Sequence, residues 1–127
     1  MRATKSRSHA GQKEILIAVN SFDGAVALLE SIGCEKKSYQ ESKRELWKLD
    51  NVEIAIDTWP FLETYVEIEG SSEEIVKDIA AKLDLDYREA IFDTVNVIYK
   101  RKYGKTIDEL DKEVLKNFTF NTRNPFL

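Results

Sequence analysis

The segment from residue 52 to residue 70, VEIAIDTWPFLETYVEIEG, alternates apolar and acidic side chains on both sides of a Trp-Pro pair. A period of two predicts β-strands, because successive side chains of a strand point to opposite faces. We therefore expect strands at 52–58 and 64–69, separated by a loop, since proline cannot donate to a sheet ladder. Each strand then has one apolar face and one acidic face. The acidic face carries Glu53, Asp57, Glu67 and Glu69.

An acidic face of this kind has two interpretations. Antiparallel sheets commonly leave one face in water, and alternating glutamates are compatible with that arrangement. However, like charges on neighbouring strands repel each other, and no lysine interrupts these four acids. The cluster then needs a cation, nearby arginines or raised carboxyl pKa values. We favour a divalent cation bound by two or three carboxylates.

The rest of the chain supplies further strands and several helices. Residues 12–19 alternate like a strand and place Glu14 on the side opposite the apolar residues, and 35–49 reads as a long polar strand that includes Arg44. Asp50-Asn51 is typical of a tight turn. Helices are expected at 21–32, 71–83, 86–103 and 106–116, with capping-box spacing at Ser71 and Glu74 and again at Thr106 and Glu109. This order predicts an α+β fold whose sheet is mainly antiparallel.

Composition excludes several kinds of site. The chain has 127 residues, a net charge of −4, one cysteine and one histidine. These counts exclude an intrachain disulfide and a cysteine zinc cluster, and they make histidine-based triads improbable. If a metal binds, carboxylates must hold it, which favours Mg²⁺ or Mn²⁺. The acidic balance gives no reason to expect nucleic acid, and without a long apolar run we expect no membrane contact and a cytoplasmic location.

The same residues resemble a known family. The segment IDTWP…YVEIEG, the strand KRELWKL before it and the pair KEILIAV and LLESIG upstream are similar to the C-terminal half of the CYTH domain. That family includes class IV adenylate cyclases and thiamine triphosphatases. The resemblance runs from about residue 11 to the C-terminus. It implies a triphosphate tunnel, in which antiparallel strands close into a flattened barrel with helices packed on its outer face.

The resemblance also implies roles for individual residues. Glu67, Glu69 and Asp57 match the catalytic carboxylates, and Glu14, Glu53, Asp57, Glu67 and Glu69 would form the metal-binding wall for Mg²⁺ or Mn²⁺. Arg44, with Lys43 or Lys5, would bind phosphate, since the planar guanidinium pairs bidentately with phosphate oxygens. The substrate class is tripolyphosphate, thiamine triphosphate or a nucleoside triphosphate. Hydrolysis and cyclisation both remain open.

One part of the family pattern is missing from this sequence. The domain normally opens with a Glu-x-Glu-x-Lys strand, which this chain lacks, so 1–11 is interpreted as a basic remnant and 12–127 as the CYTH-like domain. Three explanations compete: a truncated product of a longer enzyme, which we favour; a homodimer or partner chain that completes the barrel; or a reduced relative without turnover. The alternative function is therefore a non-catalytic phosphate- or metal-binding or interaction module.

Overall fold

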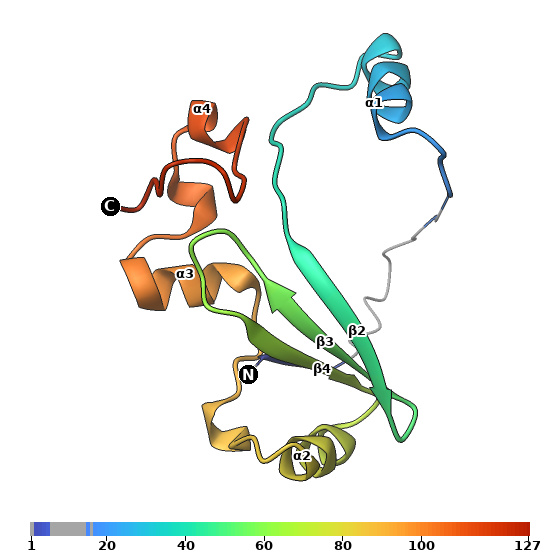
Figure 1. Ribbon diagram of the computed structural model, residues 1–127, viewed down its shortest axis with the longest axis vertical. Helices are drawn as coiled ribbons and strands as arrows, with labels where there is room; N and C mark the ends of the chain where they lie inside the picture. The colour runs from blue at the N-terminus through green and yellow to red at the C-terminus, as the bar shows by residue number, and fades with distance from the viewer. Residues whose placement is uncertain (1, 6–14, 16) are drawn as a thin grey trace.

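Four strands form one sheet in the order β1-β4-β3-β2 (Figure 1). The computed structural model describes residues 2–5, 15 and 17–127, with only the backbone of 2–5. The central meander is antiparallel, as expected, and consists of β2 (Lys43–Leu49), β3 (Val52–Thr58) and β4 (Tyr65–Gly70). The fourth strand, β1 (Arg2–Lys5), pairs in parallel with β4, which the sequence interpretation did not include.

The turn between β2 and β3 has the backbone that its sequence predicts. Asp50 and Asn51 have φ values of 50° and 64°, both in the left-handed region. That conformation matches the twist of the two flanking strands, and Asp and Asn tolerate it better than most residues. The two-residue turn fixes the register of the hairpin, in which Leu49 lies opposite Val52 and Arg44 lies opposite Asp57.

Helix α2 (Glu73–Lys82) covers the apolar face of the sheet. Its Val76, Ile79 and Ala80 form one buried cluster with residues of β3 and β4, namely Val52, Ile54 and Ile68. The expected helix is thus confirmed, but its cap is Ser72 rather than Ser71: the Ser72 hydroxyl accepts a hydrogen bond from the Ile75 amide at 3.3 Å. Burying this stripe is the main stabilising contribution of the helix, at about 25 cal/mol per Å² of apolar area.

A second core joins the loop after β3 to the C-terminal part of the chain. Leu62, Tyr99, Ile107 and Phe118 are buried together there, and the Tyr99 hydroxyl donates a 2.6 Å hydrogen bond to the carbonyl of Pro60. The elements that form this unit are short. They are α3 (Val95–Tyr103), the 3₁₀ turn η2 (Ile107–Glu109) and α4 (Lys112–Leu115).

The single helix expected at 86–103 is wrong, because the chain is extended between a 3₁₀ turn and α3. Residues Tyr87–Glu89 form the turn η1, and α3 begins only at Val95. Two aspartates explain the interruption. Asp86 accepts from the Arg88 amide at 2.9 Å, and Asp93 accepts from the Thr94 amide at 2.7 Å. Such local bonds compete with the helical ladder.

Helix α1 (Phe22–Ser31) stands away from the sheet at one end of the molecule (Figure 1). Its boundaries follow the sequence: Ser21 accepts from the Gly24 amide at 3.0 Å, and Gly33 after the helix has φ 94°. None of its residues is buried. The strand expected at 12–19 is wrong for 15 and 17–19, which are exposed and not in a strand; the remainder of that prediction, 12–14 and 16, lies outside the described residues.

The C-terminal segment anchors the chain just before β2. Gln40 forms a parallel bridge with Phe118, where the Tyr39 amide donates to Leu115 and the Phe118 amide donates to Tyr39, each at 2.9 Å. The long strand expected at 35–49 is therefore correct only from residue 43, since the backbone before it pairs with the C-terminal segment. Within the described residues, no helix has the length and apolar character needed to cross a membrane.

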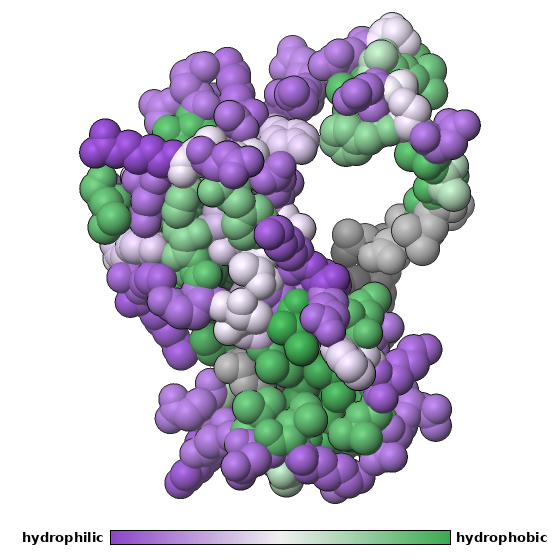
Figure 2. Space-filling view, in the orientation of Figure 1, coloured by the Kyte–Doolittle hydropathy of each residue, from purple (hydrophilic) through white to green (hydrophobic). Residues whose placement is uncertain are grey.

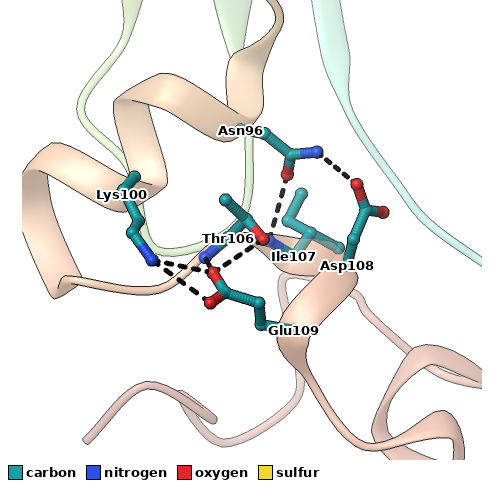
Figure 3. Close-up of polar contacts among 6 residues, drawn as sticks. All are labelled: Asn96, Lys100, Thr106, Ile107, Asp108 and Glu109. Atoms are coloured by element: carbon teal, nitrogen blue, oxygen red, sulfur yellow. Dashed lines mark hydrogen bonds and ion pairs between the residues drawn. The ribbon is translucent and has the colours of Figure 1, made fainter.

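The capping box predicted at Thr106 is present and ties α3 to η2 (Figure 3). The Glu109 carboxylate accepts from the Thr106 amide at 2.7 Å and from Lys100 at 3.1 Å. These bonds lower the pKa of Glu109 to about 2, the Thr106 amide making the largest contribution and Lys100 the next. On the other side of the turn, Asn96 accepts from the Ile107 amide at 3.0 Å.

We expect Asn51→Val to lower the free energy of unfolding by about 1–2 kcal/mol, because a β-branched residue resists the left-handed backbone. Asn51→Gly allows the same left-handed backbone at no steric cost, so the free energy of unfolding should stay the same or rise. Urea unfolding of the two variants measures the difference. Equal stability of both variants would contradict the turn conformation.

We expect Glu109→Gln to destabilise the protein at neutral pH and to have no effect in strong acid. A carboxylate whose pKa is lowered on folding contributes stability above its ordinary pKa of 4.5, and this contribution is lost as the pH falls to about 2. The melting temperatures of variant and wild type should therefore converge between those two pH values. The matched control is Glu113→Gln, which removes an exposed carboxylate paired with Lys116; a similar pH-dependent gap in the control would contradict the prediction.

Candidate functional site

The acidic residues share one face of the sheet, opposite the face that α2 covers. The antiparallel register brings the predicted site residues of β2, β3 and β4 into neighbouring positions. The directly opposed pairs on this face are Arg44 with Asp57, Leu46 with Ala55, Lys48 with Glu53, Ala55 with Glu67, Glu53 with Glu69, and Asp57 with Tyr65. Directly opposed residues of an antiparallel pair have side chains on the same face. The parity of 52–58 and 64–69 therefore placed the acids correctly relative to one another.

Arg44 is the centre of the polar network on this face. Its Nε donates to Asp57 Oδ1 at 2.7 Å, and its Nη2 donates to Asp57 Oδ2 at 2.6 Å and to Glu67 Oε2 at 3.0 Å. Asp57 is 2% exposed and Glu67 is 8% exposed, whereas the Arg44 side chain is 49% exposed. Two buried carboxylates thus share one guanidinium that also reaches solvent, and the three groups together keep one negative charge.

The electrostatics of this network keep Arg44 charged. Its pKa is raised above the ordinary value, chiefly by the hydrogen bond to Asp57 and also by the charges of Asp57 and Glu67, against the opposing effect of burial. The three bonds use Nε and Nη2, and among the described residues no bond to Nη1 is present. A guanidinium has five N–H donors, so this arrangement leaves donors that can bind a further anion at the sheet surface.

Glu53 and Glu69 lie opposite each other beside this network, and both are exposed. Lys48 lies opposite Glu53 on β2. The sequence interpretation missed Lys48, although it follows Arg44 by four residues and therefore has the same strand parity. The acidic face thus contains both an arginine and a lysine from the edge strand, which reduces the repulsion among its acids.

Of the other predicted phosphate-binding residues, the described part of the structure places the side chain of Lys43, which is not brought to Arg44. The Lys43 ammonium lies 4.7 Å from the centre of the Phe120 ring, and as the neighbour of Arg44 in β2 its side chain belongs to the opposite face. Lys5 has Gly70 as its backbone partner in β1, and its side chain is outside the described part of the structure. Glu14 is also outside the described residues. The roles of these three residues remain predictions.

The described carboxylates of this face are of the ligand type that a hard divalent cation prefers, but they are not arranged around a common point. Oxygen donors from several acids are the ligands that Mg²⁺ and Mn²⁺ prefer. Yet within residues 15 and 17–127, no three His, Cys, Asp or Glu side chains are grouped so that they could hold a metal ion. Asp57 gives both oxygens to Arg44, and Glu67 gives Oε2. The arginine therefore occupies part of the donor set that a metal would use.

Comparison with known proteins gives one family. The model of the CYTH domain matches residues 3–100. This range contains α1, α2, most of α3 and every sheet residue except Arg2. Comparison with curated proteins and comparison with solved structures gave no significant match.

We expect Arg44→Met to lower the free energy of unfolding by about 2 kcal/mol, because it leaves Asp57 and Glu67 buried without the guanidinium. This is the low end of the range for a hydrogen-bonded charge pair, since half of the Arg44 side chain is exposed to screening water. Urea unfolding of Arg44→Met, Asp57→Asn and the double variant gives the coupling energy. Additive effects of the two substitutions would contradict a direct stabilising pair.

Proposed function

Because the chain belongs to the CYTH domain family, whose members bind triphosphates, we propose that the acidic face binds the triphosphate group of a small molecule and supports metal-dependent attack on it. The observation that carries this proposal is the placement of Arg44. Two carboxylates hold its guanidinium at the surface of the sheet, with donors directed to neither of them. Asp57, which the sequence predicted as catalytic, is in this proposal a positioning residue for Arg44.

We propose Glu53, Glu67 and Glu69 as the residues that hold Mg²⁺ or Mn²⁺. They occupy adjacent register positions on β3 and β4, and two of them are open to solvent. When bound, a divalent cation neutralises charge on phosphate oxygens and so favours attack by an oxygen nucleophile. The chain's own contribution is to orient phosphate with Arg44 and to provide carboxylates of fixed spacing on a sheet.

A second candidate is binding without turnover. The observation that favours it is the absence, among the described residues, of a group of three acids that could hold a metal, together with the engagement of Asp57 and Glu67 by Arg44. In this version the face recognises a polyphosphate by charge and hydrogen bonds alone. Tripolyphosphate would then bind equally well with and without Mn²⁺, and no phosphate would be released.

We expect Mn²⁺-dependent release of phosphate or pyrophosphate from at least one of tripolyphosphate, thiamine triphosphate and ATP. Arg44→Met should lower kcat/KM roughly a hundredfold, as loss of one preorganised charged donor does in other enzymes. Arg44→Lys should restore only part of it, because a lysine cannot form the bidentate contact. The matched control is Arg101→Met, which removes an exposed arginine of α3. Absence of turnover by the folded chain with every substrate would refute the catalytic proposal and leave the binding version.

We expect Mn²⁺ to raise the melting temperature of the wild-type chain and to do so much less in Glu67→Gln and Glu69→Gln, because a neutral amide is a weaker ligand for a hard cation. Glu45→Gln serves as the matched control, since Glu45 lies in β2 and accepts a hydrogen bond from the Trp47 indole at 2.8 Å on the other face. Thermal shifts with and without Mn²⁺ make this comparison. An undiminished shift in both site variants would remove Glu67 and Glu69 from the metal site.

A further inference from the structure

Two apolar surfaces are left uncovered by the elements that the structure describes. The first is the stripe along α1 and its C-cap, which contains Phe22, Ala25, Val26, Leu29 and Ile32. Phe22 is 65% exposed and Ile32 is 70% exposed. A stripe of this width, repeated at three and four residues, is what a helix normally buries against another element. The ring of Tyr39 packs edge-on against the ring of Phe22, with 6.2 Å between the two ring centres. This contact involves only one residue of the stripe.

The second surface is a groove of about 420 Å³ on the apolar face of the sheet, beside the C-terminal end of α2. Figure 2 shows hydrophobic residues gathered over this end of the molecule, and a separate group of them on α1. Trp47, which is 58% exposed, forms one side of the groove. The full lining is Trp47, Lys48, Leu49, Ile54, Ile56, Val66, Leu83 and Leu85.

The helix α1 and the groove lie at opposite ends of the molecule (Figure 1). The segment that follows α1 is fixed at Tyr39 and Gln40 by the backbone bonds to Phe118, directly before β2 begins at Lys43. The groove lies at the other end of β2, next to Leu49 and the turn. Seven strand residues separate these ends by about 20 Å. In the single chain α1 lies at the end of the molecule away from this groove and does not fill it (Figure 1). The connection 32–38 spans at most about 25 Å, which is enough to carry the helix to a groove at this distance.

The exposed area of the chain is large enough for a stable dimer. A compact monomer of this mass exposes about 6,900 Å², whereas this chain of 14.7 kDa exposes 9625 Å². The excess is about 2,700 Å², compared with about 800 Å² per partner in a standard interface and more in obligate homodimers. Two complementary surfaces on one chain can both be buried by a single two-fold operation, in which each helix fills the groove of the other chain.

We propose that the chain forms a homodimer in which α1 of each subunit docks its stripe into the apolar groove beside α2 of the other subunit. The proposal is independent of the triphosphate site, because the groove lies on the opposite face of the sheet. Segment 32–38, which precedes the fixed Tyr39, acts as the connection that crosses between subunits. Each α1 is then covered on the side where Leu29 and Ile32 are exposed in the single chain.

Sedimentation equilibrium of the full chain tests this proposal, and we expect a mass of twice 14.7 kDa. Leu29→Glu should raise the dimer Kd at least about tenfold, because it places a carboxylate in each apolar groove. The matched control is Ala27→Glu, which adds the same charge to the opposite, exposed side of α1. No residue of α1 is buried in the single chain, so both variants should fold, and Leu29→Glu should lose only the stability that dimerisation adds. A monomeric wild type, or equal effects of the two variants, would overturn the proposal.

Cross-linking determines which chain supplies the helix. Cys34 follows α1 and is the only cysteine of the sequence, and Leu83→Cys adds a second thiol in the lining of the groove. A short bis-maleimide should join Cys34 of one subunit to the new cysteine of the other and give a covalent dimer on a denaturing gel. Wild type and Leu83→Cys combined with Cys34→Ser are the controls. A cross-linked monomer would show that α1 fills its own groove and would overturn the exchange.

Discussion

The alternation of side chains along β3 determines most of this structure. Ile54 points into the core with α2, while Asp57 on the other face pairs with Arg44. Because β3 lies between β4 and β2, both neighbouring strands must place apolar residues on the face that α2 covers and polar residues on the opposite face. A shift of register by one residue would place carboxylates under α2. The same constraint therefore holds the core together and brings the charged groups of three strands to one surface.

The charged surface is best understood as a solution to a desolvation problem. Asp57 and Glu67 are buried, and burial of two carboxylates on adjacent strands is strongly unfavourable unless an opposite charge accompanies them. Arg44 meets this requirement with three hydrogen bonds from one side chain. The position of this arginine is therefore dictated by stability as well as by any ligand. A cation that bound at this face would compete with the guanidinium for Glu67, so its affinity would depend on the mobility of Arg44.

Local chemistry was predictable from the sequence, and long-range packing was not. The turn at Asp50, the strand 52–58 and the membership in the CYTH family follow from residues close together in the chain. The interruption before α3 arises from aspartate side chains that bind nearby amides, and a count of apolar spacing does not detect it. Nor does a sequence pattern reveal that no residue of α1 is buried. It also does not reveal that the backbone of Phe118 pairs with that of Gln40. For the site, parity placed Arg44 with Asp57, and it could also have placed Lys48 on their face, although the sequence interpretation missed that residue.

The contact between the C-terminal segment and the start of β2 has a consequence for how the chain folds. The hairpin of β2 and β3 is closed by two residues, whereas the hydrogen bond from the Phe120 amide to Glu41 joins positions 79 apart. Closing a long loop costs entropy before such distant contacts form, so the meander is expected to assemble first and the contact between Glu41 and the C-terminal segment last. Until that contact forms, the chain between α1 and β2 is not fixed to the C-terminal segment, and α1 is held less closely to the rest of the fold.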